Sequence, residues 1–313
     1  MTGPPLSPAQ SLSRSAPSCA PHPRTTACPS PSTELSPSSD GSLRPPQQGN
    51  PSPGRSVIFL MIGDDGLLGS DAAALAVSLI LALVTLKATS LLGHFGLLSA
   101  SETRKVTHIG VGVVYLLSWT LFSSRPEARY WACVAVLVPT VKVLIVGLRL
   151  LQDEELLRGM TRTKDPSELL YGPLMYGIVS STWTVLFWKD TPVGIVGLAA
   201  LYGGDGLAGL LGIRYGSARL PHNRNKTWVG TAACVFGTFT MSLLVLAVLS
   251  HLGKLGALTP AHPGMATSSQ WLLLVQSIAL VSLVAAAAES LDVKELDNIT
   301  VPVAVSLTLM TLI

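Results

Sequence analysis

Long apolar segments, each interrupted by a short polar connection, recur from residue 69 to the end of the chain. A helix needs about 20 mostly apolar residues to cross a bilayer, and most of these segments reach or approach that length. No β-barrel alternation is present, so satisfying the backbone in lipid requires helices. The sequence therefore predicts an all-α, polytopic transmembrane bundle of about seven or eight spans. The expected spans are 69–92, 108–124, 128–148, 170–188, 191–212, 229–252, 271–288 and 300–313, the last being short.

Composition supports a membrane protein and excludes other classes. Only 12% of the residues are charged, against about 25% in soluble domains, so a soluble enzyme with an ordinary surface is excluded. The net charge of +3 and the absence of a basic patch interleaved with aromatic residues argue against nucleic acid as a partner. The cysteines show no CxxC spacing, so neither a zinc site nor a disulfide framework is expected. They are Cys19, Cys28, Cys133 and Cys234.

Residues 1–56 differ from the rest, because they hold 13 of the 22 prolines, 13 serines and only two acids, Glu34 and Asp40. Such a segment buries too little apolar surface to fold, and we predict that it is disordered. A serine-rich, arginine-containing and acid-poor N-terminus is typical of an organelle transit peptide. A plain cytosolic tail is the alternative interpretation. Residues 57–313 are then expected to form one integral-membrane domain.

Basic residues are unequally divided between the two sets of connections. With eight spans, eleven lysines and arginines fall on one side of the membrane and four on the other. Connections rich in lysine and arginine face the cytoplasm or its topological equivalent. The richer set is Arg104, Lys105, Arg149, Arg158, Arg162, Lys164, Arg214, Arg219, Arg224, Lys226 and Lys294, and the other set is Arg125, Arg129, Lys189 and Lys254.

Two polar clusters on the basic side are candidates for binding phosphate. Arg104, Lys105 and His108 stand at the expected start of the second span, where free N–H groups favour anions. The alternative is a simple membrane-interface anchor. Lys226 and Thr227 follow three arginines and precede an apolar segment, which suits a polyphosphate, although the Walker pattern is absent.

Acidic residues mark two further candidates. Asp205 is the one charge in an apolar segment and is flanked by Gly204 and Gly206. A carboxylate at such depth is costly unless it has a function. The glycines permit an unwound turn that suits a nucleotide phosphate or Mg²⁺, although close helix packing also explains glycines. Acids and an amide also gather before the last span and suit Mg²⁺, with a solvated turn as the alternative. They are Glu289, Asp292, Glu295, Asp297 and Asn298.

Four motifs occur in a familiar order: Arg104-Lys105-x-x-His108, the stretch from Gly204 to Gly212, Lys226-Thr227-Trp228-x-Gly230, and Glu289 followed by Asp297-Asn298 and Pro302. Residues 65–313 thereby resemble the polyprenol kinase family, which includes phytol and farnesol kinases and, distantly, dolichol kinase. The short final segment departs from the family pattern.

The resemblance implies phosphorylation of an isoprenoid alcohol, most simply phytol, by CTP or UTP with Mg²⁺, in a chloroplast membrane and upstream of tocopherol synthesis. Farnesol or geranylgeraniol as the acceptor, and the endoplasmic reticulum as the location, are alternatives. By position it implies that Asp205 serves the nucleotide–Mg²⁺ site or is the base, and that Lys226 with Arg104 or Lys105 contacts phosphate. Glu289, Asp297 and Asn298 would complete metal or nucleotide binding. A small-solute transporter with Asp205 in a broken helix is the competing class.

Overall fold

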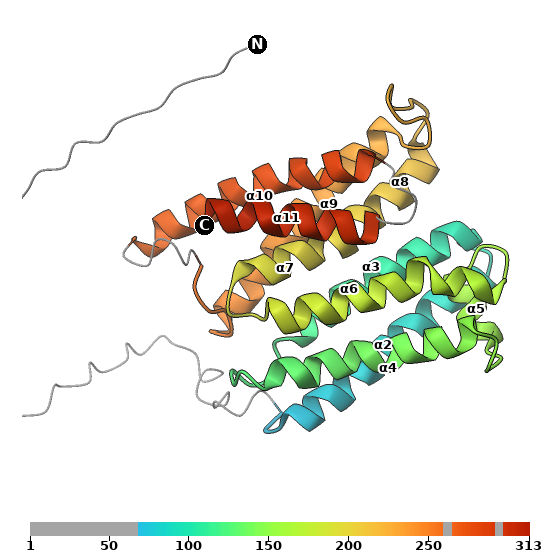
Figure 1. Ribbon diagram of the computed structural model, residues 1–313, viewed down its shortest axis with the longest axis horizontal. Coiled ribbons are helices and arrows are strands. Elements are labelled where there is room, and N and C mark those ends of the chain that lie inside the picture. The colour runs from blue at the N-terminus through green and yellow to red at the C-terminus, as the bar shows by residue number, and fades with distance from the viewer. Residues whose placement is uncertain (1–67, 259–264, 292–296) are drawn as a thin grey trace, which may run out of the picture. The chain divides into compact units, whose positions relative to one another are not determined.

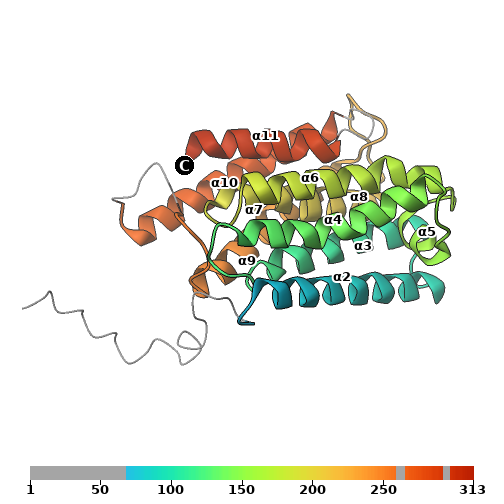
Figure 2. The same ribbon diagram turned by 60° about the horizontal axis from the view of Figure 1, so that its bottom comes forward.

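The computed structural model describes residues 68–258, 265–291 and 297–313, and within them the fold is entirely helical apart from one isolated β-bridge. The predicted all-α class is therefore confirmed, while the expectations for residues 1–56 lie outside the described residues. Figures 1 and 2 show the helices running roughly alongside one another. They are α2 (Asp71–His94), α3 (Ala100–Ser118), α4 (Ala128–Gly147), α5 (Glu154–Met160), η1 (Pro166–Leu170), α6 (Gly172–Leu186), α7 (Pro192–Ala199), η2 (Ala200–Asp205), α8 (Gly206–Tyr215), α9 (Trp228–His251), α10 (Thr267–Ser290) and α11 (Asp297–Leu312).

Each of the eight expected spans corresponds to a helical segment of the described chain. Five segments are long and apolar enough to cross a membrane, namely α2, α4, the continuous segment Pro192–Tyr215, α9 and α10. The remaining three are α3, which carries three charges in its first two turns, α6 with 15 residues and α11 with 16 residues. The number of spans across a bilayer therefore stays a prediction.

The helix N-terminus expected beside Arg104, Lys105 and His108 is wrong by two turns. Helix α3 begins at Ala100 rather than at His108, because Ser99 and Glu102 form a capping box. The Ser99 hydroxyl accepts from the Glu102 N–H (3.3 Å), and the Glu102 carboxylate accepts from the Ser99 N–H (2.9 Å). This reciprocal cap satisfies free N–H groups of the first turn. Arg104 and Lys105 therefore project from the body of a helix and do not stand in front of one.

The segment α7–η2–α8 runs through the middle of the helices, and every residue of α7 and η2 is buried. It contacts α3, α6, α9 and α11, and Figure 1 shows α6 on one side of α7 and α11 on the other. Small residues permit this position: a Cβ on Gly203 would lie 2.8 Å from the main-chain oxygen of Gly237 on α9. The expected unwound turn is absent, and residues 200–205 instead form a π-helical turn within a continuous helix.

The described connections fall at two opposite ends of the helices, as the alternation of spans predicts. At one end, the 216–227 connection meets the end of α10, where His222 and Asn223 bond Ser290. At the other end, the amine of Lys189 donates to the main-chain oxygens of Trp119 (3.3 Å) and Phe122 (3.0 Å), just beyond α3. The first end, which carries the larger basic set, is called the basic end below. Which face of a membrane it occupies stays a prediction.

The buried amine at the opposite end makes stability depend on pH. Burial, reinforced by the charge of nearby Lys254, lowers the pKa of Lys189 to about 7, whereas an unfolded lysine has a pKa of about 10.4. Between these values the unfolded chain holds a proton that the folded protein has lost, so stability rises with pH. We expect the unfolding temperature in detergent to rise between about pH 7 and about pH 9. Lys189→Met should remove most of that rise.

Lys87→Met provides the matched control, because the Lys87 side chain is 64% exposed on α2. This variant should keep the pH dependence of the wild type. A Lys189→Met protein whose unfolding temperature still rises with pH as steeply as the control would contradict the assignment to Lys189.

Candidate active site

A cavity of about 1490 Å³ opens at the basic end and extends between the helices. Its outer part is lined by charged and polar side chains from α3, the η2–α8 junction, the 216–227 connection and the end of α10. Its inner part lies among α2, α3, α4 and α6, and is mostly apolar. One continuous space therefore joins a charged region to a groove that runs into the bundle.

Asp205 lies at the boundary between these two parts and forms an ion pair with Lys105. The Lys105 amine is 2.9 Å and 3.1 Å from the two carboxylate oxygens, and 3.4 Å from the main-chain oxygen of the same residue. Asp205 is only 6% exposed, so the pair compensates a charge that would be costly alone. The contact joins α3 to the π-helical turn across 100 residues of sequence.

His108 lies one turn further along α3 and faces the same carboxylate. Its Nε2 atom is 2.8 Å from the main-chain oxygen of Leu201 and 3.5 Å from Asp205 Oδ2. A carbonyl only accepts, so Nε2 carries the proton in this contact. The imidazole also packs on Tyr176 of α6, with ring centroids 4.4 Å apart. His108 is therefore fixed in orientation beside Asp205, on the cavity wall.

Gly209 makes room for Lys105. A Cβ built on Gly209 would lie 2.3 Å from Lys105 Cε and 2.9 Å from its Nζ, so a methyl group there must displace the amine. Because a lysine side chain is flexible, we expect Gly209→Ala to fold normally but to weaken the ion pair with Asp205. Measured as kcat/KM, activity should fall about tenfold, the loss of one charge-assisted hydrogen bond.

The control for this variant is Gly159→Ala on α5, where the new methyl group would meet Leu86 at an ordinary 3.7 Å. This protein should keep wild-type activity. Full activity of Gly209→Ala would show that the position of the Lys105 amine does not matter.

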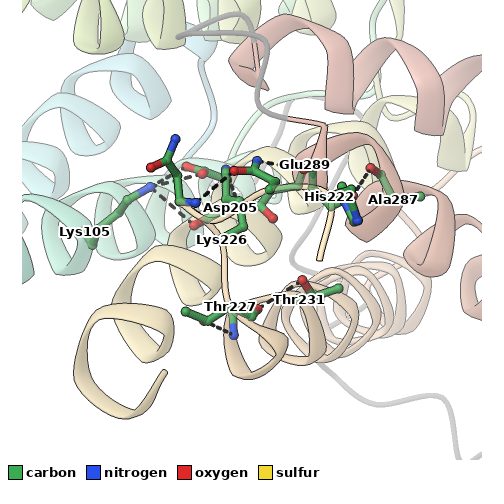
Figure 3. A network of polar contacts seen from close by, with 12 residues as sticks. Lys105, Asp205, His222, Lys226, Thr227, Thr231, Ala287 and Glu289 are labelled. Carbon is green, nitrogen blue, oxygen red and sulfur yellow. Dashed lines mark hydrogen bonds and ion pairs between the residues drawn. The ribbon is translucent and has the colours of Figure 1, made fainter. Parts of the chain in front are cut away.

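A second ion pair lies beside the first. Lys226 Nζ is 2.5 Å from Glu289 Oε1, and Glu289 is 4% exposed at the end of α10. Figure 3 shows Lys105, Asp205, Lys226 and Glu289 next to one another. All four line the cavity. The site thus contains two buried carboxylates, each held by a lysine from a different part of the chain.

The local structure of the 216–227 connection positions Lys226. Arg219 and Thr227 form an isolated antiparallel bridge, and the Leu220 N–H donates to the Lys226 carbonyl (3.0 Å). Thr227 then caps α9, since its hydroxyl accepts from the Gly230 N–H (3.0 Å). Thr227 lines the cavity, but its hydroxyl oxygen already serves as the helix cap.

The remaining predicted residues divide into those that reach the cavity and those that do not. Arg104 and Asn298 line it. Gly204 and Gly206 do not: their Cβ positions face Thr238 of α9 and Ile109 of α3, as close helix packing requires. Asp297 is the first residue of α11, and its side chain lies outside the described part of the structure. Asp292 and Glu295 lie outside the described residues altogether.

The donor chemistry of the site is compatible with a divalent cation. Asp205 and Glu289 line the same cavity and are both buried. Mg²⁺ is usually bound by one or two carboxylates together with substrate phosphate oxygens, so these two residues fit it by donor type. Within the described residues, no three His, Cys, Asp or Glu side chains cluster as a protein-only metal site.

The connection 149–171, which joins α4 to α6, forms part of the mouth of the cavity. Arg162, Thr163, Glu168 and Tyr171 line it. The Glu168 carboxylate accepts from the Arg162 N–H (2.7 Å) and the Thr163 N–H (2.9 Å), which fixes this segment. No local sequence pattern marks this connection as part of a cavity, because its position depends on the packing of the helices around it.

Comparisons with known proteins identify the relatives of this chain. Probable phytol kinases, all described as chloroplastic, match it: the maize (Zea mays) protein is 40% identical over 213 residues, which cover 67% of this chain and 66% of the relative. The japonica rice (Oryza sativa) protein is 39% identical, covering 72% and 70%. The wheat (Triticum aestivum) protein is 37% identical, covering 77% and 81%.

No family model matches the chain, and no solved structure matches it. The curated relatives therefore carry the assignment. Identity of 37–39% across more than two thirds of both chains leaves one conclusion, that this chain belongs to the phytol kinase family.

Proposed function

We propose that the protein transfers the terminal phosphoryl group of a nucleoside triphosphate to the hydroxyl group of an isoprenoid alcohol, with phytol as the first candidate. The observation that carries this proposal is the continuity of the cavity, which joins two buried ion pairs to an apolar groove. Its volume of about 1490 Å³ exceeds the ~300–1,000 Å³ usual for one ligand. The space therefore suits a water-soluble donor and a lipid acceptor together.

The chemistry requires little beyond positioning and charge neutralisation. The alcohol oxygen forms a bond to the terminal phosphorus, the bond from that phosphorus to its bridging oxygen breaks, and a nucleoside diphosphate leaves. Asp205, at the boundary of the charged region and the groove, is placed to accept the proton of the alcohol. The Lys105 and Lys226 amines are placed to exchange their carboxylate partners for phosphate oxygens. Mg²⁺ held by Asp205 and Glu289 would neutralise phosphate charge.

The finer parts of the proposal concern the donor and the pathway. We infer CTP, or alternatively UTP, as the donor, from the resemblance of the motifs around Asp205 and Lys226 to those of polyprenol kinases. The phytyl monophosphate would then feed tocopherol synthesis. Farnesol and geranylgeraniol remain alternative acceptors, because an apolar groove recognises all three tails by the same contacts.

One assay tests the proposal against the transporter alternative. Membranes containing the protein are supplied with CTP, UTP or ATP, each crossed with phytol, farnesol, geranylgeraniol, dolichol and diacylglycerol, and labelled lipid phosphate is measured. Formation of phytyl monophosphate with CTP or UTP supports the proposal. No lipid phosphate with any pair, from membranes that contain the folded protein, would refute it.

The names of the relatives support a chloroplast membrane as the location, with the endoplasmic reticulum as the alternative. We expect residues 1–56, fused to a fluorescent reporter, to direct it into plastids, because their composition is that of a transit peptide. Microscopy of plant cells measures this result. Diffuse cytosolic fluorescence would favour the plain tail, and a loss of kinase activity on deleting these residues would contradict their separation from the membrane domain.

A further inference from the structure

The apolar groove ends at Tyr115. On α3 the cavity is lined by residues from Ser101 to Tyr115 and by none beyond it. On the neighbouring helices its innermost lining residues are Ser78 of α2, Ala135 of α4 and Ser180 of α6. The next residues inward, Trp119 and Thr184, are fully buried and outside the cavity. The ring of Tyr115 thus occupies the inner end of the space between α3 and the helices α4 and α6.

Tyr115 is held in this position by contacts to all three sides. Its hydroxyl lies 2.6 Å from the Thr184 hydroxyl of α6 and donates to the main-chain oxygen of Ala132 on α4 (3.3 Å). Its ring meets Trp119 edge to face, with centroids 6.0 Å apart. Trp119 is itself packed against Trp188. A side chain bonded to both opposing helices and backed by buried aromatic rings forms a rigid wall.

The rise per residue along α3 gives the depth of the groove. Lys105, which marks the charged region, and Tyr115 are ten residues apart on α3, or about 15 Å at 1.5 Å per residue. We propose that the Tyr115 ring is the floor of the acceptor groove and limits the length of the isoprenoid tail. A groove of this depth holds a farnesyl tail in extended form and a phytyl tail in bent form, so the acceptor class is a short isoprenoid alcohol and long polyprenols are excluded. This inference rests on the proposed function of the same site.

Two opposite substitutions test the floor. Tyr115→Ala removes the ring and frees about the volume of one isoprene unit, so the ratio of kcat/KM for a prenol one isoprene unit longer than phytol to kcat/KM for phytol should rise about tenfold. Val136→Phe adds a ring near the floor, since Val136 lines the groove on α4. It should lower the kcat/KM for phytol relative to that for farnesol by about tenfold. Such ratios do not depend on how much of each protein folds.

Tyr115→Phe keeps the ring and should leave both ratios within about twofold of the wild type. Tyr130→Ala is the matched control, because Tyr130 lies on α4 with 59% exposure and does not line the cavity. If the ratios are unchanged in both Tyr115→Ala and Val136→Phe, the proposed floor is wrong. The proposed function still stands in that case, provided that the wild type phosphorylates phytol. Failure of the wild type to phosphorylate any of these alcohols would instead refute the proposed function.

Discussion

Asp205→Asn is expected to lower kcat by about 10²–10⁴-fold, the usual cost of losing a general base or a charge partner at the reacting centre. Asparagine keeps the shape of the side chain and its fit at the 6% exposed position beside the π-helical turn. It removes the proton acceptor and the negative charge that faces Lys105 and His108. Turnover is measured at saturating donor and alcohol, with the amount of membrane-inserted protein matched to that of the wild type.

Loss of the partner charge also leaves the Lys105 amine buried, so stability must be followed separately. Lys105 retains 14% side-chain exposure, and removing one member of a buried pair destabilises a protein. The unfolding temperature of each variant in detergent is therefore measured alongside its kinetics. Asp190→Asn is the matched control, because that carboxylate is 62% exposed at the opposite end. Near-normal turnover of Asp205→Asn would move the reacting centre elsewhere in the cavity.

Lys226→Ala should raise the KM for the nucleotide about 10–100-fold, the equivalent of losing one or two charge-assisted hydrogen bonds to phosphate. The KM for the alcohol should change little, because Lys226 lies at the charged part of the cavity and not along the apolar groove. Steady-state kinetics with each substrate varied in turn separate the two effects.

Two further proteins distinguish a role in binding phosphate from a structural one. Arg224→Ala is the matched control, since Arg224 belongs to the same connection but is exposed and does not line the cavity. The double variant Lys226→Ala/Glu289→Gln removes the buried carboxylate charge that the single variant leaves without its lysine. If the double variant regained the wild-type KM for the nucleotide, Lys226 would serve only to neutralise Glu289.

The helices were predictable because an apolar segment of span length has few alternatives in lipid. The residues at which the helices begin were less predictable. Helix α3 begins two turns before the expected position, because Ser99 and Glu102 cap it there although the first two turns are polar. The glycines were ambiguous from the sequence. Gly204 and Gly206 serve helix packing, while Gly209 makes room for a lysine of another helix.

Asp205 was recognisable as a site because a lone carboxylate in an apolar segment needs an explanation. Its partner, Lys105, was not recognisable, because it is 100 residues away and is brought to Asp205 by the packing of α3 on η2 and α8. The pairing of Lys226 with Glu289 has the same origin. Tyr115 and Tyr176 carry no sequence signal at all, since aromatic residues on apolar helices most often belong to a core.

The π-helical turn at residues 200–205 also sets the phase of the helix on either side of it. A π-turn holds one residue more than an α-turn would, so α7 and α8 are out of register by about 100°, the rotation of one residue at 3.6 residues per turn. Deleting one residue here would let the helix continue smoothly. The deletion would rotate either Gly209 away from α3 or α7 away from α11. A uniform α-helix cannot keep both the contact of Gly209 with Lys105 and the contact of α7 with α11. A chain of this family that lacks the extra residue would need a different lysine to reach its buried carboxylate.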